Sequence, residues 1–169
     1  MKAKLIVEGK EFPIEIQDLE LQKLLTSQKK TGYERIDKLN TYYYYQDYNG
    51  NTEFEYDVRD VYDVARYNNA NYYSDKTVAE NNIRADKLLR QLRRFAVEHG
   101  KYGLDWSNLA CQKFSIFYDY TEKKLEIACN HRDRHLFNIY FDSNVVANAA
   151  IETFHDELIW YFTEYKDSL

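Results

Sequence analysis

The chain has 169 residues, of which 44% are hydrophobic, with one proline and five glycines; it is long enough to bury a core, and this composition argues against a largely disordered protein. A formal net charge of −5 argues against general attraction to nucleic acid and leaves room only for a local basic surface. Because no run of roughly 20 apolar residues and no secretory segment is present, we expect no membrane span, and we expect the two cysteines to lie in a reducing cytoplasm.

Residues 1–30 are predicted to form a small N-terminal element. Two β-rich runs flank Glu8-Gly9-Lys10, and apolar residues alternate with polar ones after this turn, which is the period of a strand. This pattern predicts a tight hairpin over residues 4–16. Leucines at helical spacing then predict a short amphipathic helix over residues 17–25.

An internal repeat organises the rest of the chain, because residues 71–80 resemble residues 139–148. Each copy places two aromatic residues, Tyr72-Tyr73 or Tyr140-Phe141, before a Ser/Asp pair. Serine and aspartate cap helices because a side-chain oxygen accepts an otherwise unpaired backbone N–H. The repeat therefore predicts two extended entries whose aromatic residues pack under the following helix. The helices are expected at about 75–99 and about 142–165.

A predicted hairpin precedes each copy of this motif. Residues 42–48 resemble residues 114–120, and a second strand-like run follows each of them, at 52–56 and 124–129. Asn49-Gly50 predicts a type I′ turn in the first hairpin, since both central residues of that turn need a positive φ. In residues 52–56 glutamate alternates with aromatic residues, so one face of this second strand should be acidic and the other aromatic.

These elements predict an α+β protein in which two repeated hairpin–helix units pack on antiparallel sheet, beside the N-terminal element. The two units are expected at residues 33–100 and 112–169, and they share a core. Residues 57–71 lie between hairpin and helix in the first unit, and their valine spacing fits a short helix or an irregular loop equally well.

Carboxylates and tyrosines alternate in and after the first hairpin, and they form the main candidate binding surface. Carboxylates interleaved with tyrosines imitate the spaced charges of a nucleic-acid backbone and suit a basic groove on a partner protein. A solvated, solubilising surface is the competing interpretation. The candidate residues are Glu53, Glu55, Tyr56, Asp57, Asp60, Tyr62 and Asp63.

A basic surface is the alternative candidate, and it would bind phosphates. Its cations also suit the end of the first long helix, where they stabilise the helix dipole without any ligand. Tyr42–Tyr45 would supply a platform on which single-stranded bases stack, although only alternate tyrosines share a face and the glutamates opposite repel phosphate. The basic residues are Arg84, Lys87, Arg90, Arg93, Arg94, Arg132 and Arg134.

Catalytic and metal motifs are weak in this sequence. Cys129, His131, Asp133 and His135 are close together, but a zinc site generally combines two separated ligand pairs, and Cys111 stands alone. We therefore expect no metal and no cofactor at this segment. No Ser/His/Asp order, nucleophile elbow or phosphate-binding loop is present in the sequence, so we expect a protein that is not an enzyme.

The opening residues 1–12, the tyrosines at 42–45, the repeated motif at Tyr72 and Tyr140 and the closing segment 159–162 resemble small accessory proteins of bacteriophages and mobile elements of Gram-positive bacteria. Some similar proteins are anti-CRISPR inhibitors of type II Cas9. The resemblance implies a stoichiometric inhibitor that binds a host defence protein, with Cas9 as the first candidate. A single-stranded nucleic-acid-binding protein and a homo-oligomeric phage structural module are the alternatives, and the sequence does not determine the oligomeric state.

Overall fold

The computed structural model describes residues 2–7, 10–15, 30–135 and 138–167, and its internal contacts divide the chain into the units Met1–Thr31 and Gly32–Leu169. In the first unit, β1 (Lys2–Val7) pairs antiparallel with β2 (Lys10–Glu15), from Lys2 opposite Glu15 to Val7 opposite Lys10. The predicted N-terminal hairpin is therefore confirmed. The helix predicted over residues 17–25 lies outside the described residues.

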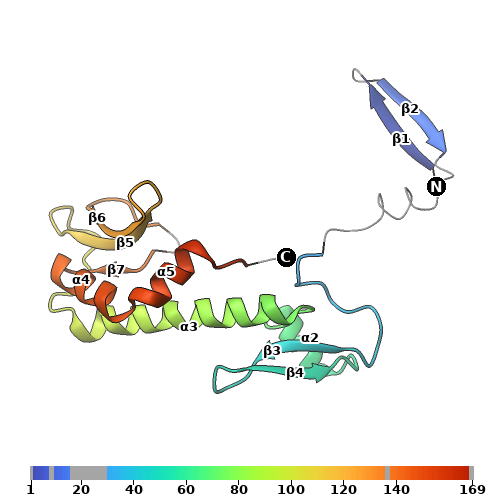
Figure 1. The fold of residues 1–169 in the computed structure, drawn as a ribbon, viewed down its shortest axis with the longest axis horizontal. Helices are drawn as coiled ribbons and strands as arrows, with labels where there is room; N and C mark the ends of the chain where they lie inside the picture. Colours follow the sequence, from blue (N-terminus) through green and yellow to red (C-terminus); the bar gives the residue numbers. More distant parts are fainter. Residues whose placement is uncertain (1, 8–9, 16–29, 136–137, 168–169) are drawn as a thin grey trace. The chain divides into compact units, whose positions relative to one another are not determined.

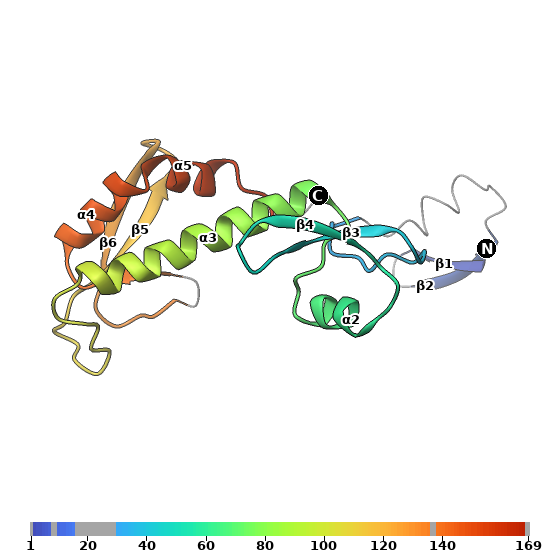
Figure 2. The same cartoon turned by 90° about the horizontal axis from the view of Figure 1, so that it is seen from below.

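The second unit contains both copies of the repeat, and its mixture of helices and antiparallel strands confirms the α+β class (Figures 1 and 2). The first copy consists of β3 (Tyr42–Gln46), β4 (Thr52–Tyr56), α2 (Val61–Asn68) and α3 (Lys76–His99). The second copy consists of β5 (Lys113–Asp119), β6 (Lys124–Asn130), β7 (Tyr140–Phe141), α4 (Asn144–Thr153) and α5 (His155–Thr163).

In each copy of the repeated motif the second aromatic residue pairs with the first strand of its hairpin and packs against the helix that follows, as the sequence predicts. The first aromatic residue does not pack under that helix, because Tyr72 stacks on Tyr43 and Tyr140 contacts Trp106. Tyr73 bridges antiparallel to Tyr44 of β3, and Phe141 of β7 pairs antiparallel with Phe114 of β5. The helix that follows is capped in the same way in both copies: Asp75 accepts the Val78 N–H at 3.0 Å, and Ser143 accepts its counterpart at 3.3 Å. The hairpins themselves lie in separate sheets, ordered β3-β4 and β6-β5-β7.

The helix α3 is shared by the two copies, because its ends belong to different hydrophobic clusters. Near its start, Val78 and Ala79 pack with Tyr73 and, from the first hairpin, Tyr44. Further along, α3 contributes to a larger aliphatic and aromatic core with the second hairpin, α4 and α5 (Figure 1). The predicted bounds of this helix are confirmed at Asp75 and Gly100, the two cap residues. The buried members of the larger core are Leu88, Leu92, Phe141, Val146, Ala147, Ala150 and Leu158.

The turn of the first hairpin lies where the sequence predicts it, but the predicted type I′ geometry is wrong. Among the described residues, positive φ occurs at Gly50, with φ 86°, and not at Asn49. The Asp47 N–H donates to the Asn51 carbonyl at 2.9 Å, and the Asp47 carboxylate accepts the Asn51 N–H at 2.7 Å. These bonds close a three-residue loop whose last residue, Gly50, has left-handed geometry. A type I′ turn would instead have a two-residue loop with positive φ at both residues.

The closing helix, predicted as continuous over about 142–165, is broken at Phe154 into α4 and α5. Phe154 leaves helical geometry, with φ −116° and ψ 22°. Just before it, the Thr153 hydroxyl donates to the Ala149 carbonyl at 2.7 Å, a bond that competes with the backbone ladder and bends helices. The bend lets Val146 and Leu158, on opposite sides of the break, join one core.

Candidate protein-binding surface

Two acidic residues at its start, rather than its valines, stabilise helix α2. Asp60 caps it by accepting the Tyr62 and Asp63 N–H groups at 2.8 and 2.9 Å. Asp63 returns the bond by accepting the Asp60 N–H at 3.2 Å, which completes a capping box. Of the two structures that residues 57–71 permitted, a short helix is the one that forms. Its single buried residue is Asp63.

Asp57 and Asp63 attach this helix and its loop to the first hairpin through buried hydrogen bonds. Asp63 accepts the Tyr43 hydroxyl at 2.8 Å and the Val58 N–H at 2.9 Å. Asp57 accepts the Tyr72 hydroxyl at 2.8 Å and the Arg35 Nε–H at 3.3 Å. Both carboxylates are fully buried or nearly so. A buried carboxylate needs such partners because it has lost its water.

The protonation state of this network follows from its burial and its hydrogen bonds. Burial raises the pKa of Asp57, but the hydrogen bonds from Tyr72 and Arg35 outweigh it, so the Asp57 pKa is lower than its ordinary value. Burial raises the pKa of Tyr72 to about 12. Tyr72 therefore stays a protonated donor, and Asp57 stays an ionised acceptor near neutral pH.

The Tyr72 ring also stacks on the Tyr43 ring, with centroids 4.0 Å apart.

The predicted acidic site is thus split by the structure. Asp57 and Asp63 were expected on the surface, and this expectation is wrong, because their oxygens are consumed by Tyr43, Tyr72, Arg35 and backbone donors. The other five predicted residues are exposed: Glu53, Glu55, Tyr56, Asp60 and Tyr62. Asp60 also has a structural role as the cap of α2.

The first hairpin presents two chemically different faces. Strand pairing places Tyr42 opposite Tyr56 and Tyr44 opposite Phe54, so these four aromatic side chains share one face. The Tyr42 ring lies 5.8 Å from Phe54 and 6.0 Å from Tyr56, centroid to centroid, yet each of the three stays about half exposed. Glu53 and Glu55 lie on the opposite face, which confirms the predicted division of β4 into an acidic and an aromatic face; β3 adds Tyr43 and Tyr45 to the acidic one.

Cations near the acidic face are already occupied. Arg66 donates to the Tyr43 hydroxyl at 2.5 Å and lies 3.7 Å above the Tyr45 ring. Arg59 donates to the Ile36 carbonyl at 2.9 Å and forms an ion pair with Asp57. The carboxylates of Glu53 and Glu55 remain exposed beside these groups. This face therefore carries two exposed carboxylates beside the Arg66 guanidinium, which Glu55 attracts.

Exposed apolar side chains are concentrated in the same stretch of the chain. We call the exposed side chains of β3, β4 and the α2 segment the hairpin surface, and its central residues are Tyr42, Glu53, Phe54, Glu55, Tyr56, Val58, Asp60, Val61 and Tyr62. Phe54 is 58% exposed and Tyr62 is 70% exposed. Grouped exposed aromatic and aliphatic side chains mark interaction surfaces, whereas scattered ones do not.

The alternative basic surface is only partly free. Lys87, Arg90 and Arg93 are exposed on α3, and Arg94 is exposed and pairs with Glu98 at 3.7 Å. Arg84 is committed to the second copy, since it donates to both Glu157 oxygens at 2.8 and 3.0 Å and lies over Trp160. Beyond α3, Arg132 is exposed and Arg134 lies 5.3 Å from the Trp106 ring centroid.

The proposed stacking platform at Tyr42–Tyr45 is not formed by these four residues. Tyr43 is fully buried under α2, and Tyr44 packs against the cluster at the start of α3. Tyr45 is partly covered by the guanidinium of Arg66. Tyr42 is therefore the one tyrosine of this strand that is classed as exposed, and its aromatic neighbours come from β4.

The segment after β6 does not gather a metal site in the structure. His131 to His135 are exposed, and Cys129 Sγ lies 3.6 Å from His131 Nε2. No cluster of three or more His, Cys, Asp or Glu residues suited to a metal ion occurs in the described ranges. A residue that sequence reasoning missed lies nearby: Lys113 is fully buried, and its ammonium donates to the Asn108 and His131 carbonyls at 3.0 and 3.4 Å.

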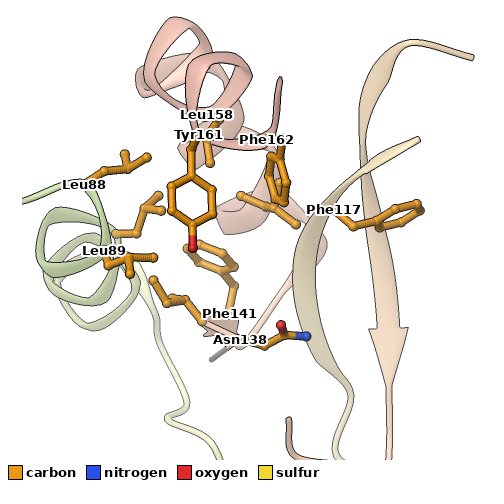
Figure 3. A pocket seen from close by; sticks show the side chains of 11 residues that line it. Leu88, Leu89, Phe117, Asn138, Phe141, Leu158, Tyr161 and Phe162 are labelled. Carbon is orange, nitrogen blue, oxygen red and sulfur yellow. The ribbon is translucent and has the colours of Figure 1, made fainter. Parts of the chain in front are cut away.

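A cavity of about 230 Å³ opens into the core of the second copy, between α3, α5 and β5 (Figure 3). The Tyr161 hydroxyl points into it, and the other polar side chain of its lining is the Asn138 amide. None of its lining side chains carries a charge, so the cavity offers no acid–base pair for catalysis. The lining residues are Leu88, Leu89, Leu92, Ile116, Phe117, Asn138, Ile139, Phe141, Leu158, Tyr161 and Phe162.

Comparisons of the chain with protein-family models, curated proteins and solved structures found no match. Within the residues that the structure describes, none of the helices has the length and apolar character needed to cross a membrane. The hairpin surface is thus defined by its geometry and chemistry alone.

Proposed function

We propose that this chain is a non-enzymatic, stoichiometric inhibitor that belongs to a phage or mobile element and acts on a host defence protein in the cytoplasm of the bacterial host. In this proposal the hairpin surface binds a basic groove of a host defence protein, and Cas9 is the first candidate because of the resemblance noted in the sequence. The observation that carries the proposal is that β3, β4 and α2 expose aromatic and apolar side chains on one face of the hairpin and along α2, and carboxylates on the other face.

This surface has the two ingredients that protein recognition needs. Aromatic rings such as Phe54, Tyr56 and Tyr62 supply large contact areas, and such anchors account for most of the energy at protein interfaces. Glu53 and Glu55 supply charge that steers a basic partner and selects against acidic ones. The buried network under the surface holds its backbone in place, which lowers the cost of ordering on binding.

The test is capture from a lysate that contains Cas9–guide complexes, followed by affinity measurement with a charge-reversed variant. The variant is Glu53→Lys with Glu55→Lys, and the matched control is Glu122→Lys with Glu152→Lys, which makes the same charge change at exposed sites of the second copy. Asp63 is left unchanged because it is buried. We expect the first variant to weaken binding by about tenfold or more, equivalent to about 1.4 kcal/mol, and the control to bind normally.

Melting temperatures of both variants show whether the fold is kept. Equal affinity of the folded Glu53→Lys/Glu55→Lys variant and the control would remove the acidic face from the interface. Binding that depends instead on Lys87, Arg90 and Arg93 would favour the nucleic-acid alternative, and that binding would fall steeply as salt is raised.

A further inference from the structure

The outer edge of β4 carries backbone groups that no strand pairs. In the part of the chain that the structure describes, β4 pairs with β3 alone. Tyr44 exchanges both of its backbone bonds with Tyr73, at 2.8 and 2.9 Å, so its backbone points away from β4. Its partner across the pair is Phe54, and in an antiparallel ladder such a residue points its own N–H and C=O outward.

The next residues along β4 confirm this alternation. The Asp57 N–H donates to the Thr41 carbonyl at 3.0 Å. The backbone N–H and C=O groups of residues 53, 55 and 57 therefore point toward β3, and those of residues 52, 54 and 56 point toward the free edge. Along that edge, the Tyr56 N–H donates to the adjacent Glu55 carboxylate, at 3.3 Å, and not to a strand among the described residues. Residues 53–56 are all exposed. An exposed strand edge of this kind is a template for an additional strand.

We propose that the partner adds an extended segment to this edge, with apolar and basic residues in alternation; this inference rests on the proposed function and specifies how the partner is bound. A strand added beside β4 places successive side chains on opposite faces. One set would continue the aromatic face beside Phe54 and Tyr56. The other set would continue the acidic face beside Glu53 and Glu55, where lysine or arginine is favoured.

The same geometry disfavours a second copy of this chain as the occupant. Two β4 edges paired with each other would bring Glu53 and Glu55 of both copies onto one face, and like charges opposite each other destabilise a strand pair. Nucleic acid is disfavoured for the same reason, since its phosphates would approach these carboxylates. A basic, extended peptide segment satisfies both the free backbone groups and the charge.

The probe is a blocked peptide of alternating valine and lysine that is long enough to cover the five residues of β4, compared with a peptide in which glutamate replaces lysine. Amide resonances of the full chain are followed by NMR as each peptide is added. We expect the lysine peptide to shift the resonances of Thr52–Tyr56 and the glutamate peptide to leave them unchanged. The Glu53→Lys/Glu55→Lys variant should reverse this preference.

Backbone pairing is tested separately by N-methylating either the valines or the lysines of the peptide. In an antiparallel addition the valine N–H groups face β4, because residues that exchange bonds with Phe54 share its face. Methylation of the valines should therefore weaken binding by about tenfold or more, and methylation of the lysines should not. Equal effects of the two methylations, no binding by the lysine peptide, or equal binding of the lysine and glutamate peptides would each overturn the proposal.

A variant of the protein links the edge to the captured partner. Phe54→Pro removes the outward N–H without removing a bond to β3, and Phe54→Ala removes the ring alone. We expect Phe54→Pro to bind the captured partner at least about tenfold more weakly than Phe54→Ala. If both bind equally well while Glu53→Lys/Glu55→Lys does not, strand addition is wrong and the proposed function stands.

Discussion

In the first copy of the repeat, Tyr72 stacks on Tyr43 and donates its hydroxyl to buried Asp57, whereas in the second copy its counterpart Tyr140 contacts Trp106 and its hydroxyl bonds to the backbone of His135 and Asp133. The two copies share a hairpin, an antiparallel aromatic entry and a capped helix. They differ in where their apolar side chains lie. The first copy buries carboxylates and hydroxyls beside a small apolar cluster and exposes many apolar side chains, and the second buries a larger aliphatic and aromatic core.

This difference in burial explains why the first copy has many exposed apolar side chains available for a binding partner. Burying hydrogen-bonded rings and carboxylates holds β3, β4 and α2 together without using the outward side chains. Those side chains are then available for a partner. In the second copy the equivalent helix and strands are consumed by the core that α3, α4 and α5 share.

The largest expected effect is on stability, from Asp57→Ala. The change leaves the Tyr72 hydroxyl and the buried part of Arg35 without their acceptor. We expect a loss of about 3 kcal/mol or more in the free energy of unfolding, the range for breaking a buried charge pair from one side. Urea unfolding measures it, with Glu55→Ala as the exposed control, which should change stability by less than about 0.5 kcal/mol. A similar small loss in both variants would show that the polar network does not stabilise the first copy.

A matched pair at equivalent positions sharpens the comparison. Tyr72→Phe removes a hydroxyl that donates to a buried carboxylate, and we expect it to cost about 1.5–3 kcal/mol, because bonds to charged groups are the stronger ones. Tyr140→Phe removes a hydroxyl that joins the His135 N–H and the Asp133 carbonyl. It should cost about 1 kcal/mol or less. Unfolding curves of the two variants decide this, and the reverse order would contradict the distinction between the two copies.

A smaller effect is expected on the pH dependence of stability. The Asp57 pKa is lowered in the folded protein, so Asp57 contributes stability above its unfolded pKa of about 3.9, and that stability is lost as the pH falls through the lower folded value. We expect the free energy of unfolding to fall less between neutral pH and acid in Asp57→Asn than in the unmodified chain. Parallel curves for the two proteins would mean that another group carries the acid sensitivity.

The repeat and its helices were predictable because their signals are local. The Ser/Asp pairs before α3 and α4, the glycine after α3 and the alternation in β4 each specify a conformation over a few residues. The burial of Asp57 and Asp63 depends on Tyr43, Tyr72 and Arg35, which are distant in sequence, so a dense run of carboxylates was interpreted as a surface. One signal was available, because Asp60 and Asp63 have the spacing of a capping box.

Other differences arise where tertiary contacts override a local pattern. The apolar residues of 142–165 suit one long helix, and the break at Phe154 follows from the Thr153 bond and from a core that needs both helical segments. A lysine at the start of a strand, such as Lys113, is expected to be solvated. Here it is buried, and its ammonium donates to two backbone carbonyls and lies over the Trp106 ring. The free edge of β4 is likewise invisible in sequence, because it depends on which strands pair.

Hydrogen–deuterium exchange of the chain, alone and bound to the captured partner, tests directly whether the hairpin surface is the interface. Residues 53–56 and the start of α2 at 60–62 are exposed in the free chain. We expect the outward amides of Phe54 and Tyr56, which no strand pairs in the free chain, to become protected in the complex, together with unchanged exchange in α4 and α5. Protection confined to residues 87–94 of α3 or to residues 131–135 would contradict the account and assign binding to the basic surface.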